Sequence, residues 1–351
     1  MVGWLAPERS AMRSFSASDS VSVAVQRTRD FLFRPFNWGT FLKLGLVAII
    51  TEGWGTNSSS SKSSRSSSGN GPMIYSLSDI PAAKIAVIVA SILFVILVVA
   101  FLYYLVTRLR FAFFHCLVHN TKEIRPGWRI YREPATRFFW MNVMVGICYL
   151  MLVVLIALPF ISGFMRLFRE MPPGGHPDFG LLLSLVLPLI PIILLLALIG
   201  FLLDLILRDW MLPHYALENA TAGEAWGWVW RSILNEKKEF IVYTLLRVVL
   251  PIVAMVGLVI VLIIPGLVLA GTIGAIEYAI HTSFAASTGA SAFVGILLQV
   301  FFGAIAFFFL LLFSICLGGP ISTWVREYAI TFYAGRYQTL GDILYPPAAG
   351  D

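Results

Sequence analysis

The feature that most constrains the fold is a series of long apolar stretches with almost no charged residues. Residues 85–106 contain no Asp, Glu, Lys or Arg, and a helix of that length crosses the roughly 30 Å hydrocarbon core of a bilayer. Only 13% of the 351 residues are charged, whereas a soluble domain carries about 25%. The chain has too few charges to cover a water-facing surface. We therefore predict an all-α, polytopic transmembrane helix bundle.

The apolar stretches predict six spans, arranged as three helical hairpins with a short interfacial helix before each hairpin. The predicted spans are 36–53, 85–106, 138–161, 179–207, 240–269 and 292–317. Together they form a transmembrane domain over 21–345, between a disordered tail at 1–20 and a short tail at 346–351. The Ser-rich stretch 54–71 is too polar to order itself, so we expect a flexible outer loop.

Proline and glycine predict breaks within these spans. Pro188 and Pro191 predict a kink in the fourth span, and Pro251 and Pro265 predict interruptions in the fifth. The run Gly318-Gly319-Pro320 predicts a bend after the sixth span.

A basic and aromatic motif recurs where the long helices end. Arg208-Asp209-Trp210 and Arg326-Glu327-Tyr328 begin two copies, each of which continues to a Tyr-Ala pair at the same spacing. A looser relative begins at Arg110. Interfaces of any membrane protein favour Arg, Trp and Tyr, but here order and spacing match too. The motif predicts helix exits at the membrane surface and a three-fold internal repeat.

The distribution of basic residues predicts the orientation. If both termini and the second and fourth loops share one side, the basic residues left for the opposite loops are Lys62, Arg65, Arg166 and Arg169. Cytoplasmic loops are enriched in Lys and Arg. We therefore expect a multi-pass protein of the cytoplasmic (inner) membrane, with both termini cytoplasmic. In a membrane protein the net charge of +6 marks cytoplasmic loops and anionic headgroups, so we expect no nucleic-acid partner.

Basic and Trp residues before the odd-numbered spans are candidate contacts for anionic lipid headgroups. The candidates are Arg125, Arg129, Arg132, Trp128 and Trp226. Each basic side chain near an anionic surface contributes on the order of 1 kcal/mol. The alternative is that these charges only fix the topology during insertion.

Polar residues within the spans form a second set of candidates, Arg247, Asn142 and Asp204, for an intramembrane polar site. Arg247 can instead snorkel to the interface, and Asp204 can pair with Arg208, four residues on. His115 and His119 have the i, i+4 spacing of a metal pair, but Cys116 stands where a metalloprotease has its general base; interfacial histidines are the simpler interpretation. Glu277 and His281 share that spacing, consistent with a local hydrogen bond or a proton relay.

Three segments resemble an uncharacterised family of bacterial six-helix integral membrane proteins: FLFRPFNWGTFLKLG at 31–45, NTKEIRPGWR at 120–129 and RDWMLP at 208–213. The resemblance extends over about 21–345. It also reaches, more distantly, to the membrane domain attached to some glycerophosphoryl diester phosphodiesterases. The family motifs carry no chemistry, so the resemblance implies a bacterial membrane location and no catalytic residues.

Two function classes follow. The first is a non-enzymatic accessory, scaffold or lipid-interacting module, whose partners are membrane lipids and an unidentified membrane protein. The second is a transporter or channel for a small or lipidic solute, favoured by the proline-broken spans. A membrane hydrolase is the weakest reading, because no nucleophile or complete metal set is visible. We therefore expect no enzyme activity and no cofactor.

Overall fold

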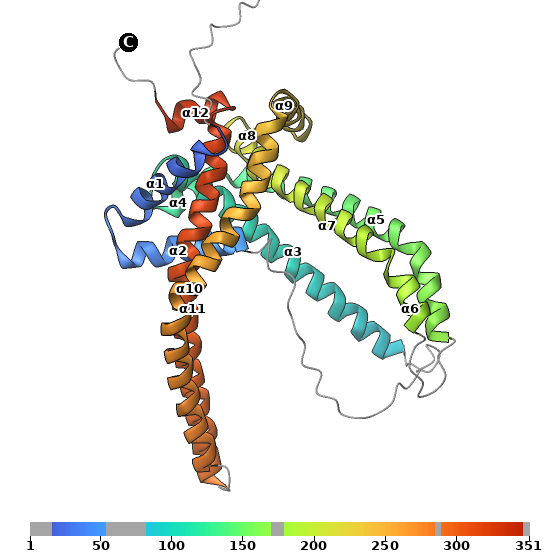
Figure 1. Ribbon diagram of the computed structural model, residues 1–351, viewed down its shortest axis with the longest axis vertical. Helices are drawn as coiled ribbons and strands as arrows, with labels where there is room; N and C mark the ends of the chain where they lie inside the picture. Colours follow the sequence, from blue (N-terminus) through green and yellow to red (C-terminus); the bar gives the residue numbers. More distant parts are fainter. Residues whose placement is uncertain (1–15, 54–81, 170–178, 285–288, 347–351) are drawn as a thin grey trace, which may run out of the picture. The chain divides into compact units, whose positions relative to one another are not determined.

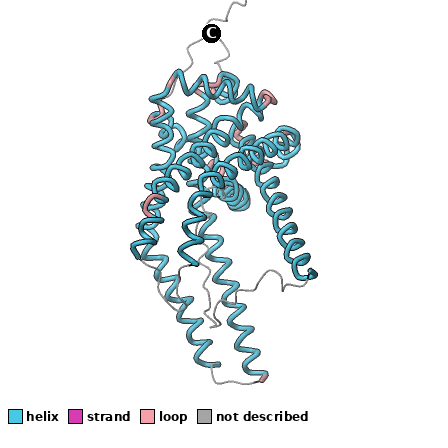
Figure 2. The backbone as a smooth tube through the Cα atoms, turned by 90° about the vertical axis from the view of Figure 1, so that its right-hand side faces the viewer, coloured by secondary structure: helices cyan, strands magenta, loops and turns pink. Residues whose placement is uncertain are grey.

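The computed structural model describes residues 16–53, 82–169, 179–284 and 289–346, and all regular structure within them is helical (Figure 2). The all-α prediction is confirmed. The helices are α1 (Asp19–Phe33), α2 (Trp38–Gly53), α3 (Ala82–Val118), α4 (Ile124–Ile130), α5 (Arg132–Arg169), α6 (Phe179–Val186), α7 (Leu189–Leu205), the π-helical turn η2 (Ile206–Met211), α8 (Leu212–Leu217), α9 (Ala222–Asn235), α10 (Lys237–Phe284), α11 (Ala290–Ala334) and α12 (Gln338–Leu344) (Figure 1).

Six segments of the described chain are long and apolar enough to cross a membrane: Ala86–Val118, Arg132–Gly163, Leu189–Leu217, Lys237–Ile264, Gly266–Phe284 and Phe293–Ala334. Their large apolar side chains are exposed, as Leu93 (65%), Leu155 (66%) and Ile264 (72%) illustrate. Soluble proteins do not leave continuous apolar faces of this extent in water. The chain therefore has the architecture of a polytopic membrane protein.

The six segments differ from the predicted spans at two places. The predicted first span is the 16-residue helix α2, shorter than the roughly 20 residues of a straight crossing, and its buried face packs against α11. The predicted fifth span belongs to α10, a continuous helix of 48 residues that contains two of the six segments.

The proline predictions were right at one site and wrong at others. The break at Pro188 is confirmed, because α6 ends at Val186 and α7 begins at Leu189. The predicted interruptions at Pro251 and Pro265 are wrong, because α10 runs through both. A membrane helix tolerates proline where local adjustments satisfy the freed backbone groups. Pro320 lies inside the continuous helix α11, where the predicted bend stays a prediction.

The chain divides into two compact units. Unit 1 draws on 1–67, 112–127 and 233–351, and unit 2 on 68–111 and 128–232. In unit 1, α11 contacts α1, α2, α10 and α12, and α10 and α11 lie side by side as a hairpin (Figure 1). At 48 and 45 residues these two helices are each about 70 Å long, so part of each lies outside a hydrocarbon core of roughly 30 Å.

The α2–α11 contact depends on two glycines. A Cβ atom on Gly319 would lie 2.6 Å from the Cα of Gly45, and one on Gly45 would lie 3.2 Å from the Ile315 side chain. Small residues let two helix backbones approach this closely. Gly319, part of the Gly318-Gly319-Pro320 run that predicted a bend, therefore lies in the packing surface between α2 and α11.

Unit 2 contains a second hairpin, in which α5 contacts α6 and α8. The Tyr149 hydroxyl donates to the Leu196 carbonyl oxygen at 2.9 Å and ties α5 to α7. The two halves of the predicted first hairpin fall in different units, so that hairpin stays a prediction.

The recurring motif is buried within the protein. Residues 207–215 and 325–334 are buried throughout, as are residues 110–114. Around Arg208 the helix widens into η2, and the Leu212 N–H donates to Leu207, five residues back. Pro213 follows this turn; it has no N–H, and its ring crowds the carbonyl four residues earlier. The aromatic and apolar residues of the motif therefore suit packing inside the protein, and two of its charges are paired: Arg208 with Asp204 and Glu327 with Arg27.

Candidate functional site

Arg247 is neutralised within unit 1. Its Nη2 lies 3.2 Å from Glu52 Oε2, its Nη1 donates to the Val325 carbonyl oxygen at 3.1 Å, and the two charged side chains are 8% and 6% exposed. The sequence could not indicate Glu52 as the partner, because 195 residues separate the two. This geometry favours a structural ion pair over snorkelling.

Asn142 and Asp204 belong to unit 2 and are satisfied locally. The Asn142 amide donates to the Phe138 carbonyl oxygen at 2.8 Å. The predicted Asp204–Arg208 pair is confirmed at 3.5 Å. The predicted intramembrane polar site therefore consists of residues that each have a partner on their own helix or in their own unit.

The C-terminal part of α11 gathers further buried charges in unit 1. Arg27 Nε donates to Glu327 Oε2 at 3.0 Å, and Glu327 is 1% exposed. Arg27 Nη2 also donates to the Leu117 carbonyl oxygen at 3.1 Å. Nearby, the Arg336 guanidinium lies 3.9 Å from the Phe332 ring centroid and 2.7 Å from a Glu236 oxygen. These contacts join α1 to α11 and to the end of α3, and they join the residue before α10 to the segment after α11.

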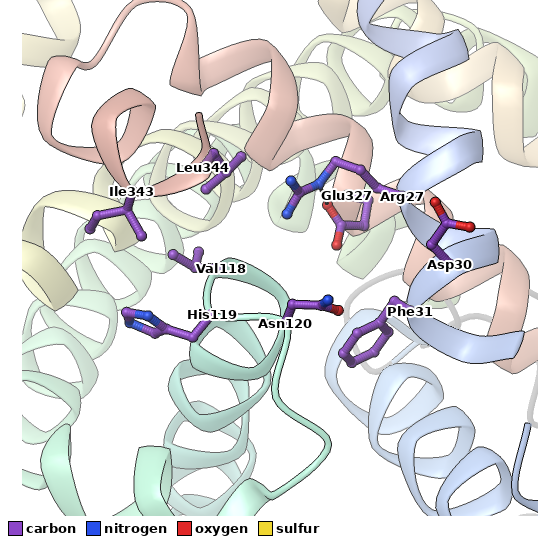
Figure 3. A pocket seen from close by; sticks show the side chains of 9 residues that line it. All are labelled: Arg27, Asp30, Phe31, Val118, His119, Asn120, Glu327, Ile343 and Leu344. Carbon is purple, nitrogen blue, oxygen red and sulfur yellow. Dashed lines mark hydrogen bonds and ion pairs between the residues drawn. The ribbon is translucent and has the colours of Figure 1, made fainter. Parts of the chain in front are cut away.

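A cavity of about 480 Å³ lies beside the Arg27–Glu327 pair (Figure 3). Its lining comes from α1, the end of α3 and the turn after it, α11 and α12. Asn120 in that turn adopts a left-handed conformation, with φ 51°, which asparagine tolerates better than most residues. The lining residues are Arg27, Asp30, Phe31, Val118, His119, Asn120, Glu327, Ile343 and Leu344. The cavity can accept a small polar molecule next to an already neutralised ion pair.

The histidine candidates lie close together without a third ligand. The rings of His115 and His119 are 4.4 Å apart. Within the described residues, no group of three or more His, Cys, Asp or Glu side chains could hold a metal ion. Glu277 and His281 lie on α10, where Glu277 is half-buried and His281 exposed.

Most of the candidate headgroup contacts are exposed. Arg125, Arg129 and Arg132 are exposed, and so is Trp226, at 41%. Trp128 is half-buried: the Arg108 guanidinium lies 4.2 Å from its ring centroid and donates to its carbonyl oxygen at 2.8 Å. Trp128 therefore positions Arg108 as well as contributing to the surface.

Helix α9 carries a second exposed tryptophan, Trp230, that was not among the candidate headgroup contacts predicted from the sequence. Trp230 is 49% exposed and stacks on Trp226, with ring centroids 6.4 Å apart. Ala225 and Val229, each one residue before a tryptophan and about 100° away around the helix, are buried. The i, i+4 spacing of the two tryptophans was the signal that could have identified this surface.

The start of α9 is held by hydrogen bonds from Thr221 to the side chain of Glu224, three residues later. The Thr221 N–H and hydroxyl both donate to Glu224 Oε2, at 3.0 and 2.8 Å. These hydrogen bonds favour the charged carboxylate and hold the pKa of Glu224 below its usual range.

Comparison with known proteins places the chain in a family without giving it an activity. No curated protein and no solved structure matches the chain significantly. The more distant resemblance to the membrane domain of glycerophosphoryl diester phosphodiesterases therefore stays a prediction. One family profile matches residues 15–343, nearly the whole chain, and its description is a family of unknown function. The chain belongs to this family, DUF7544.

Proposed function

We propose that the protein is a non-enzymatic, lipid-interacting module of the bacterial inner membrane, with both termini in the cytoplasm. The observation that carries the proposal is a contrast between the two sets of candidates. The basic residues before the third span and Trp226 and Trp230 on α9 are exposed, whereas Arg247, Asn142 and Asp204 have partners within their own units. Exposed Arg and Trp side chains suit an anionic headgroup layer.

Native mass spectrometry after gentle extraction tests the proposal. The wild-type protein should retain phosphatidylglycerol or cardiolipin in preference to phosphatidylethanolamine. A variant with Arg125, Arg129 and Arg132 all changed to Gln should lose that preference, because each charge contributes on the order of 1 kcal/mol. The same three positions changed to Lys keep the charge and should keep the preference. Equal retention of neutral and anionic lipids by the wild-type protein would contradict the proposal.

A second candidate function is transport of a small polar solute. The cavity of Figure 3 favours it, because a charged pair lines a space of about 480 Å³. Proton coupling would be the simplest chemistry for Glu327. In vesicles that enclose a pH-sensitive dye, coupled transport predicts proton entry that Glu327→Gln abolishes. The module predicts the same flux as protein-free vesicles.

A further inference from the structure

Unit 2 contains a groove whose lining includes none of the candidate headgroup contacts. It has a volume of about 960 Å³ and is formed by α5, by Leu203 and Tyr215 on the following helices, and by the turn before α9. Along α5 it is lined by Arg137, Trp140, Met141, Met144, Val145, Cys148, Tyr149 and Leu152. Small-molecule sites in proteins commonly have volumes of roughly 300–1,000 Å³.

The lining changes from polar to apolar along the groove. Along α5 the lining begins with Arg137, near Asn219 in the turn before α9, and continues to Cys148 and Leu152. From residue 137 to 152 α5 rises about 22 Å, more than the roughly 15 Å of one hydrocarbon leaflet. Arg137 falls five residues into the apolar segment that begins at Arg132, and Trp140, which is 60% exposed, follows it. This order, a cation and then an apolar channel, matches a phospholipid from phosphate to chain end.

The two tyrosine hydroxyls that line the apolar part of the groove already donate hydrogen bonds within the protein, so an occupant there need not accept them. The Tyr215 hydroxyl donates to the Met141 sulfur at 3.1 Å, and the Tyr149 hydroxyl donates to the Leu196 carbonyl oxygen at 2.9 Å. Met141 and Met144 offer flexible, polarisable walls that adapt to an acyl chain.

At the polar end of the groove, the charge of the Arg137 guanidinium is partly neutralised by a neighbouring carboxylate. Arg137 pairs with Glu133 and is 48% exposed. Its Nη1 lies 3.5 Å from Asn219 Oδ1, at the outer limit of a hydrogen bond. A guanidinium has five N–H donors in a planar fork that fits phosphate oxygens. It can therefore hold a phosphate while Glu133 stays in place.

We propose that this groove binds one diacyl glycerophospholipid, with its phosphate on Arg137 and an acyl chain along Met144, Cys148 and Leu152. The inference rests on the proposed lipid-interacting function and gives it a specific, stoichiometric site. It differs from the headgroup layer, in which several lipids exchange around exposed charges.

Cysteine protection tests occupancy in the folded wild-type protein. Cys148 lines the groove and is exposed, whereas Cys316 is half-exposed on α11 in unit 1. After delipidation in detergent, added palmitoyl-oleoyl phosphatidylglycerol should slow maleimide labelling of Cys148 about tenfold, the effect of a site about 90% filled. Labelling of Cys316 should not change. Equal rates at Cys148 with lipid and with the same amount of added detergent would overturn the proposal.

Matched substitutions separate the groove from ordinary lipid contact. Met144→Trp fills the groove, and Met151→Trp places the same side chain on α5 at a site that is 68% exposed and outside the lining. Native mass spectrometry should show one tightly held phospholipid in the wild type and in Met151→Trp, and its loss in Met144→Trp. Arg137→Gln should weaken retention about tenfold, as expected when a charged hydrogen bond is lost. Retention unaffected by both Met144→Trp and Arg137→Gln would contradict the assignment.

The two lipid proposals can fail separately. The groove lipid should persist in the Arg125, Arg129 and Arg132 triple-Gln variant, even where the preference for anionic lipid is lost. A wild-type protein that shows no anionic preference but keeps one lipid, sensitive to Met144→Trp, would refute the headgroup proposal alone. A wild-type protein that prefers anionic lipid but keeps no lipid that is sensitive to Met144→Trp would refute the groove proposal alone.

Discussion

At the residue scale, charges in this protein are placed by pairing across distant segments. Spacing along one helix predicted the Asp204–Arg208 pair correctly, because i, i+4 residues are neighbours on a helix. No local pattern could predict that Arg247 meets Glu52 or that Arg27 meets Glu327, since 195 and 300 residues separate the partners. The sequence therefore indicated that Arg247 is a charge within an apolar segment, but it could not identify Glu52 as the residue that neutralises it.

Removal of one member of the Arg247–Glu52 pair should be strongly destabilising. A buried charge left without its partner costs about 3–5 kcal/mol, so Glu52→Gln and Arg247→Gln should each lower the apparent melting temperature in detergent. The double variant should lose less than the sum of the two single losses. Asp30→Asn, which breaks the exposed Arg34–Asp30 pair, should cost less than about 1 kcal/mol. Strictly additive losses would show that the two charges do not interact.

At the element scale, hydropathy and length predicted the long helices well and their ends poorly. The run at 85–106 lies within α3, and Pro188 marks a true break. The recurring motif did not predict burial, because apolar, aromatic and charged residues suit a buried protein core as well as a membrane interface; the helix exits that it predicts stay a prediction. Residues 325–334 could be recognised as core only once α1, α2, α10 and α12 were seen around α11.

The Gly45–Gly319 crossing predicts a sharp difference between two glycine substitutions. Gly319→Ala would place a methyl group 2.6 Å from Gly45 Cα, and overpacking of this kind typically costs about 1–3 kcal/mol. Gly257→Ala in α10 has nothing within 4 Å and should be neutral or stabilising by up to about 1 kcal/mol. Thermal unfolding in one detergent measures both. Equal melting temperatures for the two variants would show that α2 and α11 are not held this closely.

The contact between Thr221 and Glu224 at the start of α9 predicts a pH dependence of that helix. Its hydrogen bonds lower the pKa of Glu224 in the folded state from an ordinary value of 4.5. Their stabilising effect is therefore present above that ordinary pKa and is lost as the pH falls through the lowered value. Hydrogen exchange, corrected for its intrinsic pH dependence, should be faster in the first turn of α9 in acid or in Thr221→Ala. Ser232→Ala, later in the same helix, should leave that turn unchanged; an equal effect would argue against this contact.

At the scale of the whole molecule, the basic residues predict the topology. With the natural cysteines replaced, cysteines introduced within 58–68 or 172–177, which lie outside the described residues, should react with an impermeant maleimide from outside intact cells. Cysteines at Arg129 and Lys237 should not, since cytoplasmic loops carry the basic excess. Labelling of Arg129→Cys in intact cells would reverse the orientation.

The internal repeat is a molecule-scale prediction that is still open. Short helices do precede the third and fifth predicted spans and α2, namely α4, α9 and α1. The recurring motif could have been selected for core packing within each unit, without duplication of a three-helix segment. Sequence spacing alone cannot separate these origins, because both require Arg, aromatic and small residues at the same helical positions.

The selection of anionic lipid by exposed Arg and Trp side chains is the central claim, and lipid quenching of tryptophan measures it most directly. Trp226 and Trp230 are exposed on α9, so lipids with brominated acyl chains should quench them on contact. In vesicles of mixed composition, brominated phosphatidylglycerol should quench this fluorescence several-fold more effectively than brominated phosphatidylcholine, given about 1 kcal/mol per nearby basic residue. Changing both tryptophans to Phe should reduce the difference, because eight other tryptophans remain, and high salt should reduce it as well. Equal quenching by the two lipids at low salt would contradict the account.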